Sequence, residues 1–239
     1  MHENNLQFKG GNPGAVQYGN FINYYQFHST EERINLLPKN IWNQMNPFVA
    51  LDVGCNAGNL TMALKDFLKK YSSLEPSILA VDIDPLLINR ANEHTSDGIT
   101  FQCLDIMDVT KRDQTINKYL IQMKVEKFKV AFCFSTTMWI HLNYGDEGLE
   151  NFLKYICSIA VVVVIEPQPW KCYKTAVKRM KQKKFVFPEF SKLKYRENVE
   201  SVIEQVLNID CNMVKLIESE RTTWERKLLI FKQKLCNIS

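Results

Sequence analysis

The chain of 239 residues is long enough to bury a sizeable core, and its hydrophobic share of 46% and charged share of 23% are ordinary for a globular protein. It contains no apolar run near the roughly 20 residues that a membrane-spanning helix needs and no apolar signal core, so we expect neither a membrane protein nor a secreted one. The seven cysteines are scattered and never form a Cys-x-x-Cys pair. This argues against a zinc site or a disulfide scaffold and favours a metal-free cytoplasmic protein, with a nuclear location left open.

The first predicted element is a flexible tail over residues 1–16, which are rich in Gly, Asn and Gln. A single domain is predicted over residues 17–239, because no internal repeat or linker-like break interrupts them. It begins with an aromatic segment over 17–28 and a helix after Ser29. Short apolar strands then alternate with helical patterns. The predicted strands are 48–53, 78–82, 99–104, 129–134 and 160–165, and the predicted helices between them are 60–71, 86–94, 114–124 and 148–156.

Two further apolar stretches, 213–218 and 227–232, predict an antiparallel pair of strands near the C-terminus. The earlier strands are apolar almost throughout, as is typical of parallel strands covered on both faces. The predicted fold class is therefore α/β, with a Rossmann-like, mostly parallel seven-stranded sheet and an antiparallel C-terminal hairpin.

The most informative motif is the turn at 54–58 after the first predicted strand, with Gly54, Asn56 and Gly58, followed by Asp82 at the end of the second strand. This arrangement is typical of a nucleotide-binding α/β unit, in which the acid binds the ribose hydroxyls. Asn56 does not fit the dinucleotide fingerprint, whose second glycine lets the backbone approach a pyrophosphate. Since S-adenosylmethionine has no phosphate, the motif favours this cofactor and the class I S-adenosylmethionine-dependent methyltransferase fold.

Polar residues also follow the third and fourth predicted strands. Asp105 follows the third and suits the adenine amino group, and Phe134 and Ser135 end the fourth. Ligands in open α/β sheets bind beyond the carboxyl ends of the strands, so we expect these residues and Asp82 to meet one ligand. For any single acid, capping of the following helix is an equal alternative.

Two later segments are candidates for an acceptor site. His141 lies in a predicted turn-rich segment beside Asn143, although a lone histidine is more often a packed or surface group. Residues 168–196 hold ten basic residues and one acid, a net charge of +9 that leaves −5 for the rest of the chain, and this suits a polyanion. The alternative is a solvated helix face. The lysines on one face of the predicted helix there are Lys171, Lys174, Lys178 and Lys181.

With these residues in view, the chain resembles the bicoid-interacting-3 (Bin3-type) RNA 5′-phosphate methyltransferases over about residues 18–232. The motifs that carry the resemblance are Gly-Asn-Phe at 19–21, the turn at 51–58, Trp-Ile-His-Leu-Asn at 139–143, Gly-Asp at 145–146 and Glu-Pro-Gln-Pro-Trp at 166–170. Segments 27–33, 137–139 and 169–173 are most similar to the branch that methylates a 5′-monophosphate. Met138 stands where the branch that caps a nuclear triphosphate RNA has lysine, whereas Tyr24-Tyr25 is more similar to that capping branch.

The resemblance implies an enzyme that uses S-adenosylmethionine to O-methylate the 5′-terminal phosphate, most simply a monophosphate, of a small RNA such as a tRNA or microRNA precursor. It implies that Arg33 pairs with the methionine carboxylate of the cofactor. The implied cofactor-binding residues are Tyr25, Arg33, Gly54, Asn56, Asp82, Ile83, Asp105, Ile106 and Phe134.

The implied chemistry needs alignment more than a base, because a terminal phosphate is largely a dianion at pH 7. Candidate catalytic residues that would hold the phosphate are, in falling order, Tyr24, His141 and Lys171. We expect an RNA partner with a 5′-phosphate end, no DNA or membrane partner, and a monomer.

Several other functions stay open. One is a capping methyltransferase of a 5′-triphosphate small nuclear RNA, and another is a class I methyltransferase for a small molecule or a protein carboxylate. A third is a catalytically weak RNA-binding module with a vestigial cofactor pocket. A nicotinamide dehydrogenase is disfavoured, since the second fingerprint glycine is missing.

Overall fold

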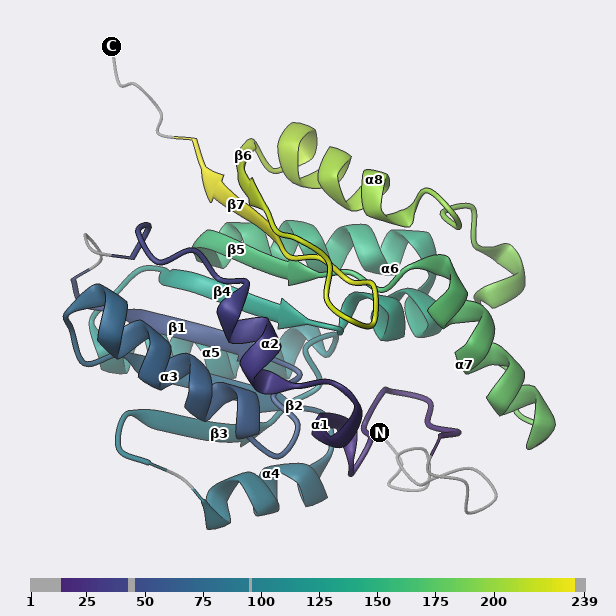
Figure 1. Cartoon of the computed structure of the whole chain (residues 1–239), viewed down its shortest axis with the longest axis horizontal. Coiled ribbons are helices and arrows are strands. Elements are labelled where there is room, and N and C mark those ends of the chain that lie inside the picture. The colour runs from purple at the N-terminus through teal and green to yellow at the C-terminus, as the bar shows by residue number, and fades with distance from the viewer. Residues whose placement is uncertain (1–13, 43–45, 95, 235–239) are drawn as a thin grey trace.

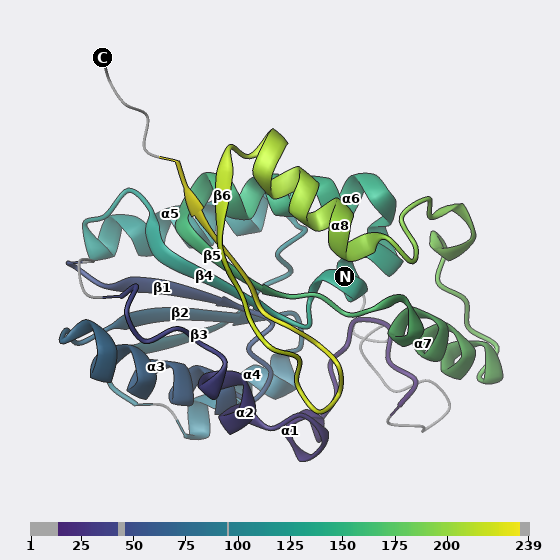
Figure 2. The same ribbon diagram turned by 45° about the horizontal axis from the view of Figure 1, so that its top comes forward.

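The computed structural model describes residues 14–42, 46–94 and 96–234, and it shows one seven-stranded sheet with helices on both faces (Figure 1, Figure 2). The strand order is β3-β2-β1-β4-β5-β7-β6; β1 to β5 pair in parallel, and β7 runs antiparallel to both β5 and β6. The predicted fold class is thus confirmed. The strands are β1 (Val49–Val53), β2 (Ser77–Asp82), β3 (Ile99–Cys103), β4 (Phe128–Phe134), β5 (Ala160–Glu166), β6 (Met213–Glu218) and β7 (Leu229–Gln233).

Three of the helices begin at a capping side chain. Ser29 accepts a hydrogen bond from the Glu32 amide at the start of α2, and Asp84 and Asp108 cap α4 and α5 in the same way. None of the helices in the described ranges is long and apolar enough to span a bilayer. The helices are α1 (Tyr24–Phe27), α2 (Thr30–Asn35), α3 (Asn59–Ser72), α4 (Pro85–Glu93), α5 (Val109–Met123), α6 (Thr137–Ile159), α7 (Trp170–Gln182) and α8 (Val199–Gln205), with short turns η3 (Phe190–Lys192) and η4 (Val206–Asp210).

The sheet separates two apolar cores, because successive residues of a strand point to opposite faces. In β1, Leu51 and Val53 belong to the core under α5, α6, α7 and α8, whereas Ala50 belongs to the core under α3 and α4. Both faces are covered in this way, which leaves the carboxyl ends of the parallel strands as the edge where polar loops gather.

The predicted N-terminal tail ends too late. Its residues 1–13 lie outside the described residues, but Ala15 and Val16 are only 0% and 1% exposed. Both are apolar, and Ala15 packs in the core that contains α6. The prediction of a tail through residue 16 is therefore wrong at these positions.

The predicted turn-rich segment before residue 148 is helical instead. Helix α6 spans Thr137–Ile159 and is interrupted at Gly145, whose φ of 73° and ψ of −172° are outside the helical region. Its apolar residues Met138, Ile140 and Leu142 are buried. Glycine adopts this conformation without steric cost, so the chain changes direction there and continues as helix.

Truncating a buried apolar side chain in the core under α3 should lower the free energy of unfolding much more than truncating an exposed one. Leu64→Ala removes a side chain that is 0% exposed, and the resulting cavity should lower the free energy of unfolding by about 2–5 kcal/mol. The control Ile121→Ala removes one that is 77% exposed, with an expected change within about 0.5 kcal/mol. Urea denaturation measures both, and equal losses would contradict the packing described.

Candidate active site

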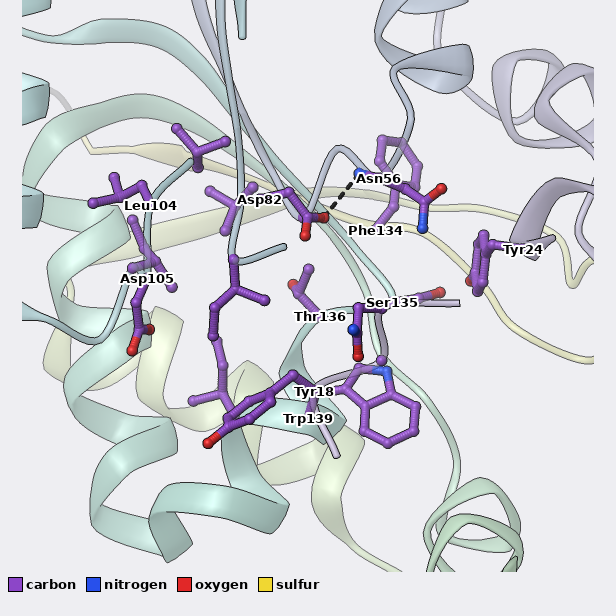
Figure 3. Close-up of a pocket in the computed structure, with 18 of the residues that line it drawn as sticks. Tyr18, Tyr24, Asn56, Asp82, Leu104, Asp105, Phe134, Ser135, Thr136 and Trp139 are labelled. Atoms are coloured by element: carbon purple, nitrogen blue, oxygen red, sulfur yellow. Dashed lines mark hydrogen bonds between the residues drawn. The ribbon is translucent and has the colours of Figure 1, made fainter. Parts of the chain in front are cut away.

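A pocket lies at the carboxyl ends of β1, β2, β3 and β4, where the strand order reverses between β1 and β4 (Figure 3). It encloses about 890 Å³ of space between its lining atoms, part of it open to solvent. All nine residues implied for cofactor binding line it. They are Tyr25, Arg33, Gly54, Asn56, Asp82, Ile83, Asp105, Ile106 and Phe134.

The turn after β1 needs backbone conformations that its residues supply. Gly54 has φ of 81°, and a Cβ there would come within 2.4 Å of Thr136 Cγ2. Asn56 also has positive φ, 53°, which asparagine tolerates better than most residues. Its backbone N–H donates to Asp82 Oδ2 at 2.9 Å, and its side-chain Nδ2 donates to the Phe21 carbonyl at 2.8 Å. The Asn56 side chain therefore ties the aromatic N-terminal segment to the pocket.

Asp82 has the geometry of a ligand-binding carboxylate. Oδ2 accepts the Asn56 N–H and Oδ1 accepts the Asp84 N–H at 3.0 Å, which leaves each oxygen a further lone pair for a ribose hydroxyl. The helix-capping alternative does not apply to Asp82, because the cap of α4 is Asp84, which accepts the Leu86 N–H at 2.9 Å. Burial raises the pKa of Asp82 to about 6.

Asp105 also accepts hydrogen bonds from the protein at both carboxylate oxygens, one of them from a side chain of α6. Oδ1 accepts the Met107 N–H at 2.9 Å, and Oδ2 accepts the Tyr144 hydroxyl from α6 at 3.2 Å. The cap of α5 is a different acid, Asp108. Asp105 thus lines the pocket, and its contact with an adenine amino group stays a prediction.

Arg33 lies fully buried at the inner end of the pocket and pairs with Glu166 at the end of β5. Its Nη2 donates to Glu166 Oε2 at 2.7 Å and its Nε to Oε1 at 3.3 Å. Nη1 is buried and has no hydrogen-bond partner in the described structure. A buried N–H without an acceptor is costly, so this atom fits the carboxylate of S-adenosylmethionine. Together with the Asp82 lone pairs, it shows that the residues present suit this cofactor.

Tyr24 lies beside Arg33 and receives hydrogen bonds from two guanidinium groups. Arg33 Nη2 donates to its hydroxyl at 2.7 Å and Arg226 Nη1 donates at 3.2 Å. Arg226 Nη1 also donates to Ser135 Oγ at 2.6 Å, and the Ser135 hydroxyl donates to Glu166. The result is a buried polar cluster of two arginines and one carboxylate.

The electrostatics of this cluster follow from burial and charge. Burial opposes ionisation of Glu166, but Arg33 and Arg226 together lower the pKa of Glu166 below its usual value. His28 stacks on the Tyr24 ring at 4.6 Å, and burial beside the two arginines lowers the pKa of His28 to about 4. His28 is therefore neutral near pH 7. Arg226 was not predicted as a site residue, because nothing in the polar segment before β7 marks it as one.

The other two predicted catalytic residues lie outside the pocket lining. His141 is 0% exposed, with Nε2 2.7 Å from Asp146 Oδ1 and Nδ1 3.1 Å from the Tyr173 hydroxyl. Both ring nitrogens are thus occupied by the protein. Lys171 is exposed on α7 and forms an ion pair with Glu225. Of the three candidates, only Tyr24 meets the cofactor-binding residues.

Comparisons with known proteins identify the family of the chain. The family model for bicoid-interacting protein 3 (Bin3) matches residues 128–233. The pre-miRNA 5′-monophosphate methyltransferase of Xenopus laevis is 40% identical over 239 residues, which cover 92% of this chain and 93% of that protein. This chain belongs to the Bin3 family. The 7SK snRNA methylphosphate capping enzyme of Mus musculus, at 27% identity, matches 66% of this chain and 32% of its own length.

Solved structures confirm the fold of this Bin3-family chain. The bifunctional kinase-methyltransferase WbdD superposes with a TM-score of 0.55 at 16% identity, over 95% of this chain and 43% of WbdD. At that identity the likeness concerns the fold alone, and it confirms the predicted class I methyltransferase arrangement. Within the residues described, no group of three or more His, Cys, Asp or Glu side chains is arranged to hold a metal ion.

The raised pKa of Asp82 predicts that cofactor affinity depends on pH. Below about pH 6 the carboxyl becomes protonated and loses its charged acceptor, so affinity for S-adenosylmethionine should fall about 10- to 100-fold as pH drops through this value. Isothermal titration calorimetry between pH 5 and 8 measures it. Asp82→Asn should bind weakly with a flatter pH profile. Asp52→Asn is the control, since burial also raises the pKa of Asp52 to about 6 but Asp52 does not line the pocket. If the loss of affinity at low pH disappeared in Asp52→Asn but persisted in Asp82→Asn, Asp82 would not be the group that causes it.

The position of His141 predicts a structural effect on mutation. His141→Phe leaves Asp146 and Tyr173 without this partner, so the free energy of unfolding should fall by about 1–3 kcal/mol while the affinity for S-adenosylmethionine stays within about twofold. Chemical denaturation and calorimetry measure the two quantities. Unchanged stability combined with lost turnover would instead restore the catalytic role predicted from the sequence.

Proposed function

We propose that this chain is an S-adenosylmethionine-dependent methyltransferase that O-methylates the 5′-terminal monophosphate of small RNAs, such as a tRNA or microRNA precursor. The observation that carries the proposal is the junction of two sites at Arg33. On one side are the Asp82 carboxylate and the unpartnered Arg33 Nη1, which suit the cofactor. On the other side is Tyr24, held by Arg33 and Arg226. The relative from Xenopus laevis, matched along nearly its whole length, carries a name with this activity.

The chemistry follows from the groups at this junction. S-adenosylmethionine, when bound, supplies an electrophilic methyl group. Asp82 would accept hydrogen bonds from its ribose and Arg33 Nη1 would hold its carboxylate. A 5′-monophosphate has its second pKa near 6 and is largely a dianion at pH 7, so the protein need not supply a base. Because the Tyr24 oxygen accepts two N–H groups, its own proton is free to donate to the phosphate and orient it.

A monophosphate is favoured over a triphosphate by the residue at position 138. Met138 is only 4% exposed and packs in the core, so it brings no cation to the site. A longer anionic end would need further positive charge near the pocket. The match to the capping enzyme is also weaker and covers less of the chain.

RNA binding is supported by the charge on α7. The lysines at 171, 174, 178 and 181 are exposed, whereas Tyr173, Ala176 and Met180 on the opposite face are buried. An exposed basic face suits the phosphate backbone of a nucleic acid, and the start of α7 is linked to the site because Cys172 contacts Arg226, which donates to Tyr24. We include in the proposal that the nucleic acid is RNA and not DNA, that the enzyme is a monomer, and that it acts in the cytoplasm. Size-exclusion chromatography tests the second of these points, and cell fractionation the third.

The proposal predicts which RNA ends accept a methyl group. Purified protein and labelled S-adenosylmethionine are incubated with three RNAs that differ only in a 5′-hydroxyl, 5′-monophosphate or 5′-triphosphate end. Label should enter the monophosphate RNA at least about tenfold faster than the triphosphate RNA, and should not enter the hydroxyl RNA, which has no acceptor. Asp82→Asn is the matched control for a cofactor-dependent signal. Efficient labelling of the hydroxyl RNA would refute a phosphate acceptor, and a preference for the triphosphate RNA would favour the capping alternative.

A further inference from the structure

The loop between β6 and β7, residues 219–228, lies against the N-terminal helices (Figure 1, Figure 2), and its Arg226 donates to Tyr24, which lines the pocket. The backbone and hydroxyl of Thr223 both donate to the Glu32 carboxylate in α2. Trp224 Nε1 donates to Glu166 Oε1 at 3.1 Å. The Arg226 N–H donates to Thr222 Oγ1 at 2.9 Å, which closes a tight turn. Arg226 is thus held in a fixed position before any substrate binds.

The side chain of Arg226 is buried but has unused donors. The residue is 7% exposed, and its Nε is buried without a hydrogen-bond partner in the described structure. Among the residues that the structure describes, its Nη2 has one hydrogen-bond partner, the Cys172 thiol at 3.8 Å. Nη1 alone makes strong contacts, to Tyr24 and Ser135. A guanidinium group has five N–H donors, so this one retains capacity for an anion.

The positive charge of the cluster is also not fully balanced by negative charge. Glu166 forms its close pair with Arg33 at 2.7 Å and lies 4.0 Å from Arg226. Two guanidinium groups therefore share one carboxylate, and within the described structure no other carboxylate is within 4.0 Å of Arg226. A buried positive charge without a counter-ion is unfavourable, and an incoming anion removes that cost.

The location of Arg226 indicates which anion it meets. Arg33 lines the cofactor pocket, whereas Arg226 lies behind Tyr24 and Ser135 and does not line it. On its other side Arg226 contacts Cys172, at the start of the basic helix α7. It therefore lies between the pocket and the face that suits an RNA backbone, which is where an RNA end would arrive.

We propose that Arg226 binds the 5′-terminal phosphate of the RNA and, through its hydrogen bond to Tyr24, positions the Tyr24 hydroxyl toward that phosphate. This inference rests on the proposed function, since it assigns the substrate phosphate of the same site. Arginine suits both tasks, because one planar group donates to Tyr24 and Ser135 while its remaining N–H groups face an anion.

The test compares Arg226→Gln, Arg226→Lys and the control Arg221→Gln. Arg221 is in the same loop, half-exposed, and pairs with Glu200 at 3.7 Å. Binding of RNAs with a 5′-monophosphate or a 5′-hydroxyl end is measured by fluorescence anisotropy, and kcat and KM are measured on the monophosphate RNA. Wild type and Arg221→Gln should bind the monophosphate RNA about 10- to 100-fold more tightly than the hydroxyl RNA. Arg226→Gln should lose that preference and raise KM by a similar factor, and Arg226→Lys should restore part of it.

Calorimetry with S-adenosylmethionine separates a local effect from misfolding. Arg226→Gln should bind the cofactor with an affinity within about twofold of wild type. If Arg226→Gln does not fold, Arg226→Lys provides a second variant for the same measurements. An undiminished preference for the phosphate end in either variant overturns the inference, as does a loss confined to cofactor affinity, which would place the cofactor carboxylate at Arg226. If wild type prefers the monophosphate RNA in binding yet transfers no methyl group, the proposed function fails while the phosphate subsite stands.

Discussion

The buried ion pair between Arg33 and Glu166 is the contact on which the site depends. It joins α2, near the N-terminus, to the end of β5, and both side chains are 0% exposed. Removing one partner of such a pair leaves an isolated buried charge and costs about 3–5 kcal/mol. Tyr24, Ser135 and Trp224 all hydrogen-bond to one or both of these groups. The N-terminal segment and the β6–β7 loop are therefore held on the sheet edge by the same pair of charges that shapes the pocket.

Arginine can serve this structure and a ligand at once because its nitrogens are separate donors. Nε and Nη2 of Arg33 are used by Glu166, and Nη1 remains for the pocket. A lysine would have one nitrogen for both tasks and a flexible stem. The planar guanidinium group of Arg33 thus holds Tyr24 through Nη2 while Nη1 has no partner in the described structure and is left for a ligand.

Much of the fold and the position of the pocket could be predicted because their signals are local. Apolar runs gave the strands to within two residues, and the turn with Gly54 and Asn56 located the pocket. The first part of helix α6, before residue 148, was mistaken for turns because the polar and glycine residues around Gly145 break its pattern, whereas the helix predicted over 148–156 lies within α6. Arg33 and Glu166 are 133 residues apart, and Arg226 is 202 residues from Tyr24. No local pattern encodes such pairings, so the acceptor side was only partly predicted.

The Trp-Ile-His-Leu-Asn motif at 139–143 has a physical role that explains its residue types without placing His141 in the chemistry. Asn143 Nδ2 donates to the Gln17 carbonyl at 2.9 Å and so holds the N-terminal aromatic segment. His141 pairs with Asp146, whose oxygens accept the backbone N–H groups of residues 194 and 195. The first part of α6, residues 141–146, therefore holds both the segment that carries Tyr24 and the end of the basic segment. These buried hydrogen bonds fix both segments in place, which a flexible surface lysine such as Lys171 does not do.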